Sequence, residues 1–403
     1  MSLKNNRSNK PWIYIPLAML IMLCMGTVYS WSVFRPSVEE TLNIGATQSG
    51  MPFMFFLFFY AVTMPITGGL IDKKSPVLMT IIGGIMVALG WFLSGFTTNV
   101  YYLTITYGII AGSGVGVAYG VPIAVAAKWF PEKRGFVVGL TLLGYGLSPF
   151  LTAPLANLLI NNYGPMTTFK ILGLAFAVII TILALPLKFP EKTEEIDNPL
   201  EMMDGEMSED INSISIFKSK TFYALWGLFT IGTLIGLMAI SFASPVAQEV
   251  VNMGSREAAA LVSFFAIFNG IGRPIFGWLT DRFSPKFAAS VSFTLILLAS
   301  ILMLFVGEGN VVLFAIAFSI LWLNLGGWLA IAPAATGIYF GTKNYSKNYG
   351  YLFTAYGVGA IIGTMLSSSL RDIMGSYIFA FYPAIALSII ALFLAGLFLK
   401  KPE

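Results

Sequence analysis

The sequence predicts an all-α membrane protein with twelve spanning helices, arranged as two pseudo-symmetric six-helix bundles. Three observations predict this fold: an apolar composition, twelve apolar stretches of membrane-spanning length, and motifs that recur in the two halves. Of 403 residues, 57% are hydrophobic and 10% are charged, and the mean hydropathy is +0.81. This composition excludes a soluble globular domain.

The apolar stretches are each about 20 residues long, which is enough for a helix to cross the hydrocarbon core. Helices are the expected spanning element because backbone groups in lipid must be hydrogen-bonded within their own segment. The predicted spans are 12–34, 48–71, 77–96, 100–127, 135–160, 166–187, 220–244, 256–280, 286–307, 311–338, 349–370 and 376–399.

One long polar stretch divides the chain. Residues 189–219 are acidic and lack periodicity, and we interpret them as a flexible cytoplasmic linker between six-helix bundles at 1–188 and 220–403. Lysines and arginines concentrate at the N-terminus and in the loops on its side, whereas the opposite loops hold only Arg35, Arg256 and Arg371. The positive-inside rule therefore predicts a multi-pass protein of the inner (plasma) membrane with both termini in the cytoplasm.

The two halves repeat each other. "PITGGLIDKKSP" (65–76) and "PIFGWLTDRFSP" (274–285) align without gaps at an offset of 209 residues. A second pair, "GLTLLGYG" (139–146) and "GYLFTAYG" (350–357), aligns Tyr145 with Tyr356. Repeats of this kind are typical of transporters whose binding site lies at the midplane between the halves.

Several classes of protein are not predicted. The chain has one cysteine, Cys24, and no histidine, so neither a disulfide nor a metal site is expected. It has no glycine-rich phosphate loop after a strand and no buried acid pair, so we expect no enzyme and no cofactor. The net charge of +4 concerns loops and orientation, not nucleic acid. A membrane sensor or receptor is the second class that the composition allows.

Arg273 is the most informative single residue. It lies in the apolar run "LVSFFAIFNGIGRPIFGWLTDRF", eight residues before Asp281. At 1.5 Å per residue, this places it roughly 12 Å inside the helix end. An arginine at such depth costs at least about 2.5–3.5 kcal/mol. Its side chain either snorkels to the interface or provides a fixed cation for an anion.

The pattern G-x-x-x-D-[RK], at 68–73 and 277–282, resembles the signature loop of the major facilitator superfamily. The resemblance implies the major facilitator fold, in which Gly68 and Gly277 let helices approach closely. Asp72 and Asp281 would each face a helix N-terminus or a basic residue such as Arg134, in a gating contact that breaks on opening. The alternative is that each is a solvated loop acid.

Within that superfamily the chain resembles the oxalate/formate antiporter family, relatives of the monocarboxylate transporters. The matching motifs are "GTVYSWSVF", "AGSGVGVAYG", "KWFPEKRG", "FNGIGRPIFGW" and "YFGTKNYSKNYG". The resemblance implies a carboxylate site around Arg273, lined by Tyr29, Tyr119 and Tyr145. A tyrosine suits this role because its ring packs in an apolar wall while its hydroxyl donates to an oxyanion.

The chain departs from that family at informative positions. The family has a second cation, a lysine in the eleventh helix, where this chain has Tyr356. Aromatic residues of the family's tenth helix are replaced by Leu325 and Leu329, and a glutamine of its first helix is replaced by Val28. One cation matches one negative charge, since an unpaired second carboxylate costs several kcal/mol to desolvate. We therefore expect a small monocarboxylate such as formate, acetate, lactate or pyruvate. Oxalate/formate exchange, or transport of another organic anion or a neutral drug, is the alternative.

The coupling of transport to other solutes is less directly encoded. Proton-coupled monocarboxylate transporters have an aspartate four residues before this arginine, where the chain has Asn269. No other acid lies deep within a predicted span, so exchange or uniport by alternating access is favoured over proton symport. The expected partners are a small organic anion and the lipid bilayer, and the expected state is a monomer.

Overall fold

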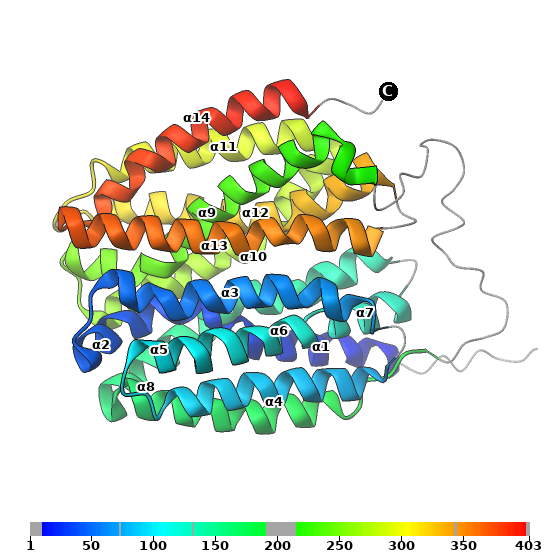
Figure 1. The fold of residues 1–403 in the computed structure, drawn as a ribbon, viewed down its shortest axis with the longest axis horizontal. Coiled ribbons are helices and arrows are strands. Elements are labelled where there is room, and N and C mark those ends of the chain that lie inside the picture. The colour runs from blue at the N-terminus through cyan, green and yellow to red at the C-terminus, as the bar shows by residue number, and fades with distance from the viewer. Residues whose placement is uncertain (1–9, 72–73, 131–132, 191–214, 342–344, 400–403) are drawn as a thin grey trace, which may run out of the picture.

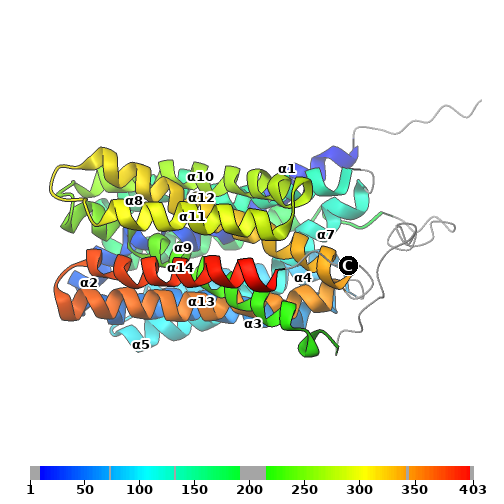
Figure 2. The ribbon, with the colours of Figure 1, turned by 90° about the horizontal axis from the view of Figure 1, so that it is seen from above.

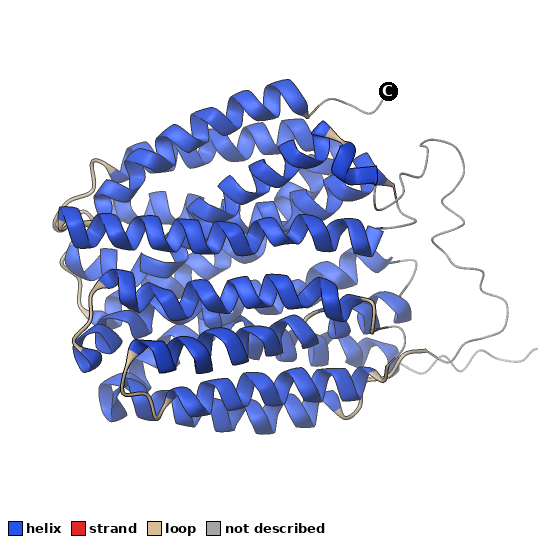
Figure 3. Ribbon diagram, in the orientation of Figure 1, coloured by secondary structure: helices blue, strands red, loops and turns tan. Residues whose placement is uncertain are grey.

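The computed structural model describes residues 10–71, 74–130, 133–190, 215–341 and 345–399. These residues form helices joined by short loops (Figure 3). The long helices lie roughly along one common axis (Figures 1 and 2), and the N-terminal ones occupy one half of the molecule while the late ones occupy the other (Figure 1). This arrangement is what a chain needs to span a bilayer repeatedly.

The first half contains one long composite helix, two regular helices, a second composite helix and a long broken one. The first composite comprises η1 (Lys10–Ile13), α1 (Tyr14–Met25), η2 (Gly26–Ser30) and α2 (Trp31–Leu42); then come α3 (Ala46–Gly68) and α4 (Pro76–Ser94). The second composite comprises α5 (Val100–Leu103), η3 (Thr104–Ala111), α6 (Gly112–Ala118) and α7 (Gly120–Trp129), and α8 (Arg134–Ala184) ends the half.

The second half begins, after the turn η5 (Ser215–Lys218), with helices that are long and apolar. They are α9 (Lys220–Glu249), α10 (Ser255–Arg282), α11 (Pro285–Met303), α12 (Val311–Phe340), α13 (Tyr345–Met374) and, after η6 (Tyr377–Ala380), α14 (Phe381–Phe398). Most of the predicted linker lies outside the described residues, so its two boundaries stay predictions.

Twelve spans result, although eleven continuous segments of the described chain are long and apolar enough to cross a membrane. The difference lies in α8, whose 51 residues would make a rod of about 77 Å. Gly164 breaks it with φ 76° and ψ 165°, a left-handed φ that glycine adopts without steric cost. The break falls between the predicted spans 135–160 and 166–187, so α8 supplies two spans.

The sequence repeat has a structural counterpart. Ser75 and Ser284 are the N-cap residues of α4 and α11, and Pro76 and Pro285 follow at the first position of each helix. Proline suits that position because its missing N–H would have no partner there. The two motifs therefore start equivalent helices in the two halves.

The two bundles meet along two equivalent pairs of helices. α3 packs along α13, and α8 packs along α10. The repeat relates α3 to α10 and α8 to α13, so a pseudo-twofold axis exchanges one contact for the other. Gly146 of α8 and Gly357 of α13, which make close approaches in the two contacts, end the second pair of repeated motifs.

We call the end of the molecule that carries residues 10 and 399 the terminal end, and the opposite end the far end. At the far end Arg35 joins the bundles. Its guanidinium donates to Ser49 Oγ (3.1 Å) and Ala46 O (2.6 Å) in α3, to Ser241 O (3.3 Å) and Oγ (3.1 Å) in α9, and to Ser368 Oγ (3.1 Å) in α13. Glu39 Oε1 lies 3.5 Å from its Nε.

This position corrects the prediction for Arg35. The sequence assigned it to a loop beyond a span ending at residue 34, whereas it lies inside α2 and its side chain is fully buried. The charges of "RPSVEE" lower the local hydropathy, but Arg35 is compensated by groups from three other helices that hydropathy does not register. Asp372 adds a second bridge, since it accepts from the backbone N–H groups of Ala46 (3.0 Å) and Thr47 (2.7 Å) across the same interface.

Removing the Arg35 bridge is expected to loosen the far end. Arg35→Gln leaves buried acceptors unpaired, which destabilises the closed far end by several kcal/mol. A destabilisation of about 1.4 kcal/mol is enough to raise the population of the open state about tenfold. The reporter is Thr364→Cys, in a Cys24→Ser background, because Thr364 is buried against Gly50 between α13 and α3. Maleimide labelling at position 364 should be at least about tenfold faster in Arg35→Gln than in the parent.

The matched control is Arg256→Gln, which removes an exposed arginine at the start of α10, at the same end. This variant should label at nearly the parental rate. Equal labelling of the Arg35→Gln variant and the parent would show that the bridge does not hold the far end closed.

Candidate functional site

Arg273 lies near the middle of α10 and is 5% exposed. Its Nε, Nη1 and Nη2 atoms all lack a hydrogen-bond partner among the described residues. The acids of the described residues lie at helix ends or in loops: Glu39, Glu40, Glu249, Glu257, Asp281, Glu308 and Asp372. A buried charge without a partner is destabilising by several kcal/mol. An anion bound beside this guanidinium would therefore stabilise the protein.

Close packing of α10 against α12 holds Arg273 in place. A Cβ at Gly272 would lie 2.1 Å from Leu323 O, and a Cβ at Gly326 would lie 2.0 Å from Asn269 O. Neither position has room for any side chain, so glycine at both lets the backbones touch. Asn269 lies one turn before Arg273 and donates from Nδ2 to Trp322 O of α12 at 3.3 Å. The section of α10 that carries the cation is thus rigidly supported.

Five tyrosines from both bundles pack together near this section, and we call them the tyrosine cluster. They are Tyr29 of η2, Tyr60 of α3, Tyr119 between α6 and α7, Tyr145 of α8 and Tyr356 of α13. All are at most 7% exposed. Tyr145 directly precedes Gly146, where a Cβ would lie 3.4 Å from Nε and Nη2 of Arg273. The cluster therefore provides polar atoms and aromatic walls beside the cation.

The rings of the cluster meet at defined angles. Tyr145 lies edge-on to Tyr29 (centroids 5.1 Å apart, 89°) and to Tyr119 (5.4 Å, 88°). Tyr60 lies 5.1 Å from Tyr119 and 5.8 Å from Tyr356. The hydroxyls of Tyr29 and Tyr356 are hydrogen-bonded at 2.8 Å across the two bundles, whereas the Tyr145 hydroxyl has no partner.

Irregular helix geometry positions two members of the cluster. Tyr29 lies in the 3₁₀ turn η2, where the first spanning helix is locally overwound. The helix that carries Tyr119 contains the π-helical segment η3. Such departures from α-helical winding rotate the following side chains and are frequent at functional sites. Gly26 contributes by close approach, since a Cβ there would lie 2.4 Å from Tyr145 O.

The structure brings together Arg273, Asn269, Tyr29, Tyr119, Tyr145 and Tyr356, all of which the sequence predicted as site residues. Their roles in binding stay predictions. Tyr60 was missed, although the repeat contains a signal for it, because Tyr60 is 209 residues before Asn269 and occupies the equivalent position of α3. Arg273 corresponds in the same way to Met64, so the cation belongs to one half.

Gly146 of α8 is a second residue that the sequence did not single out. A Cβ there would lie 2.8 Å from Asn269 Oδ1 and 3.4 Å from both Nε and Nη2 of Arg273. Its repeat partner Gly357 makes the equivalent approach to α3, where a Cβ would lie 2.9 Å from Ala61 Cβ. At Gly146 the missing side chain lets the α8 backbone approach Asn269 and Arg273 closely.

Among the described residues, the structure gives no contact between Arg273 and the three apolar residues that the sequence predicted for the site. Val28 and Leu329 are 1% and 8% exposed, and their contact with a cargo stays a prediction. Leu325 packs towards α9, since a Cβ at Gly236 would lie 2.7 Å from Leu325 Cβ.

The predicted close helix contacts at Gly68 and Gly277 stay predictions. Among the described residues of this conformation, a Cβ at Gly68 would meet nothing within 4 Å, and one at Gly277 would meet only Ala330 Cβ, at 3.9 Å. Asp281 is exposed at the end of α10. Asp72 and the side chain of Arg134 lie outside the described residues, so the predicted gating contact is not tested.

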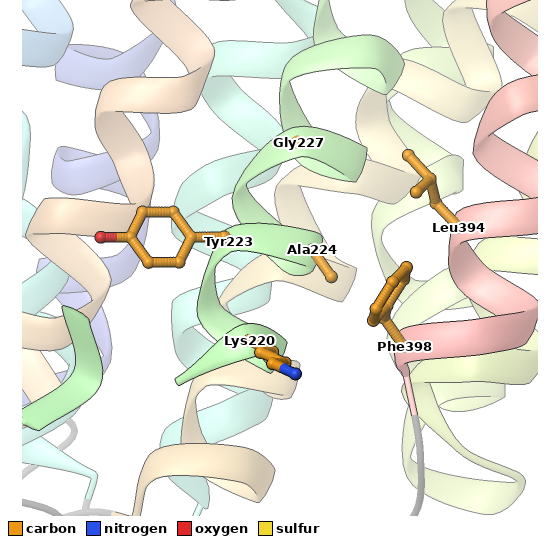
Figure 4. Close-up of a pocket in the computed structure, with 6 residues that line it drawn as sticks. All are labelled: Lys220, Tyr223, Ala224, Gly227, Leu394 and Phe398. Atoms are coloured by element: carbon orange, nitrogen blue, oxygen red, sulfur yellow. The ribbon is translucent and has the colours of Figure 1, made fainter. Parts of the chain in front are cut away.

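A separate groove opens on the outer surface near the terminal end, between α9 and α14 (Figure 4). It has a volume of about 330 Å³ and is lined by Lys220, Tyr223, Ala224, Gly227, Leu394 and Phe398. None of these residues belongs to the Arg273 site. Both helices belong to the second half, so the groove is not part of a path between the two halves.

Two transporters are similar to this chain in sequence. The chain is 28% identical over 366 residues to the oxalate:formate antiporter of Oxalobacter formigenes, an alignment that covers 90% of this chain and 86% of that protein. It is 27% identical over 323 residues to monocarboxylate transporter 12 of Xenopus laevis, covering 75% of this chain and 69% of the relative.

Solved structures share the fold. A bacterial homologue of the human lysosomal transporter Spinster, inward-facing and occupied, matches with a TM-score of 0.74 at 15% identity, covering 98% of this chain and 97% of that one. The nucleoside transporter NupG matches with a TM-score of 0.72 at 14% identity, covering 98% of this chain and all of that one. The family model described as "Major Facilitator Superfamily" matches residues 17–339 and 229–403. The chain therefore belongs to the major facilitator superfamily, and it is a multi-pass membrane transporter, not an enzyme.

Proposed function

We propose that the protein transports small monocarboxylates by alternating access, with the carboxylate bound by Arg273 between the two bundles. The observation that carries this proposal is the buried guanidinium with three unpaired nitrogens. Arginine is suited to the role because its planar fork pairs with a carboxylate through two parallel hydrogen bonds. The similarity to the oxalate:formate antiporter and to a monocarboxylate transporter supports an organic anion as cargo.

The charge of the site favours one carboxylate over two. Within the described residues, no second lysine or arginine accompanies Arg273 in the tyrosine cluster. One charge pair at about 4 Å contributes roughly 4 kcal/mol at an effective dielectric near 20. A dicarboxylate would gain this once and would bury a second, unpaired charge at a cost of several kcal/mol. Oxalate/formate exchange, which the antiporter's name suggests, is therefore the second candidate.

Exchange or uniport is the proposed mode. Asn269, which does not titrate, lies one turn from Arg273, and the described acids lie away from the middle of the spans. Proton symport is the alternative if the acid crosses in protonated form. The charge distribution described above supports cytoplasmic termini. Residence in the inner (plasma) membrane and a monomeric state complete the proposal.

Replacing Arg273 is the direct test of the site. Arg273→Lys keeps the charge but loses the bidentate fork, so uptake of labelled lactate or formate into proteoliposomes should fall at least about tenfold. Arg256→Lys is the matched control, because Arg256 is exposed on the same helix. Uptake by Arg273→Lys at the level of the control would refute the carboxylate site.

A second cation should widen the range of cargo. Tyr356 lies in the cluster with its hydroxyl 2.8 Å from that of Tyr29. Tyr356→Lys places an ammonium there, so oxalate should compete about tenfold better for lactate uptake than it does in the parent. Tyr223→Lys, at an exposed tyrosine on the outer surface, is the control. Unchanged competition by oxalate would mean that Tyr356 does not face the cargo.

Coupling is tested with a pH gradient. Because the described part of the site contains no carboxylate that gains or loses a proton, an inward proton gradient without a counter-anion should drive little lactate accumulation. Preloading the same proteoliposomes with unlabelled lactate should stimulate uptake several-fold if the protein exchanges anions. Strong accumulation driven by the proton gradient alone would establish symport instead.

A further inference from the structure

The unpaired polar atoms beside Arg273 are not all donors. Arg273 presents three nitrogens that can only donate, whereas Asn269 Oδ1 is a buried acceptor that also lacks a partner. A simple carboxylate offers acceptors alone, so it satisfies the arginine and leaves Oδ1 unpaired. A ligand that completes the site needs a hydroxyl donor next to its carboxylate.

The orientation of the Asn269 amide follows from its other contact. Nδ2 donates to Trp322 O at 3.3 Å, and the reversed amide would set two oxygens against each other there. Oδ1 therefore faces α8. A Cβ at Gly146 would lie 2.8 Å from Oδ1 and 3.4 Å from Nε and Nη2 of Arg273. Oδ1 and these two nitrogens therefore lie within about 6 Å of each other, a separation that a carboxylate and a hydroxyl on adjacent carbons of one ligand can bridge.

We propose that the site selects 2-hydroxy monocarboxylates, such as lactate and glycolate, over their unsubstituted and 2-oxo counterparts. The inference rests on the proposed carboxylate site and specifies its cargo. The carboxylate accepts from Arg273 while the 2-hydroxyl donates to Asn269 Oδ1. An unsubstituted acid leaves Oδ1 without a donor, and a 2-oxo acid places a second acceptor against it. Asn269 is then the specificity-determining residue.

The test compares three acids of nearly equal size on the purified, full-length protein. Lactate, propionate and pyruvate each carry one carboxylate and three carbons, and they differ at the 2-position. Binding is measured as the ligand concentration that raises the apparent melting temperature, or as competition for labelled lactate. A hydrogen bond of ordinary strength predicts that lactate binds about three- to tenfold tighter than propionate, with pyruvate weakest.

The variant Asn269→Leu removes the acceptor and should abolish the preference, so that lactate and propionate bind equally. Asn324→Leu is the matched control, because Asn324 is a buried amide on the neighbouring α12 whose Nδ2 donates within its own helix to Ile320 O. That control should keep the parental ratio. Because each ratio is taken within one protein, an overall loss of stability does not change it.

Two results would overturn the inference in different ways. Equal binding of lactate, propionate and pyruvate by the parent protein would refute selection by Asn269 and leave the carboxylate site standing. Absence of binding by all three acids would refute the proposed function together with this inference. The parental ranking decides the question even if Asn269→Leu does not fold.

Discussion

The buried, unpaired guanidinium of Arg273 is the constraint on which the rest of the structure depends. A charge in this position destabilises the empty protein, so the surrounding helices must hold it rigidly and exclude the acids that would neutralise it. The close crossing of α10 and α12 at Gly272 and Gly326 holds the helix section that carries Arg273. Among the described residues, the acids lie at helix ends and in loops, away from the guanidinium. An anion bound beside Arg273 would pair with this charge and so remove the electrostatic cost of leaving it unpaired.

The two halves repeat each other in backbone but not in chemistry. Gly146 and Gly357 make equivalent approaches between the bundles, yet Gly146 faces Asn269 and Arg273 while Gly357 faces Phe58 and Ala61. On α3, Tyr60 and Met64 stand where α10 has Asn269 and Arg273. One bundle therefore holds the charge, and the other contributes aromatic surface. Under the proposed function, a small cargo would therefore contact the two halves unequally, although the backbone framework around it is pseudo-symmetric.

Much of the fold could be predicted because apolar length and repeated turn motifs are local properties of the chain. Arg273 was evident because a charge in an apolar run is conspicuous in a sequence. Arg35 was misassigned, since its partners Ser241 and Ser368 are more than 200 residues away and hydropathy does not detect such pairing. The close contact at Gly272 was not predicted, because it depends on which helix faces the glycine, and a motif does not encode that.

Comparison of the two buried arginines separates architecture from function. Arg35 and Arg273 carry the same charge at similar burial, so their desolvation costs are alike. Arg35 makes five hydrogen bonds and an ion pair within the protein, and its charge is fully accounted for by the fold. Arg273 makes none. The fold would gain stability by supplying Arg273 with an acid, as Glu39 does for Arg35. The residue one turn before Arg273 is instead a neutral amide, Asn269. The protein therefore lacks that stabilisation, and the charge stays unpaired among the described residues, as the proposed ligand site requires.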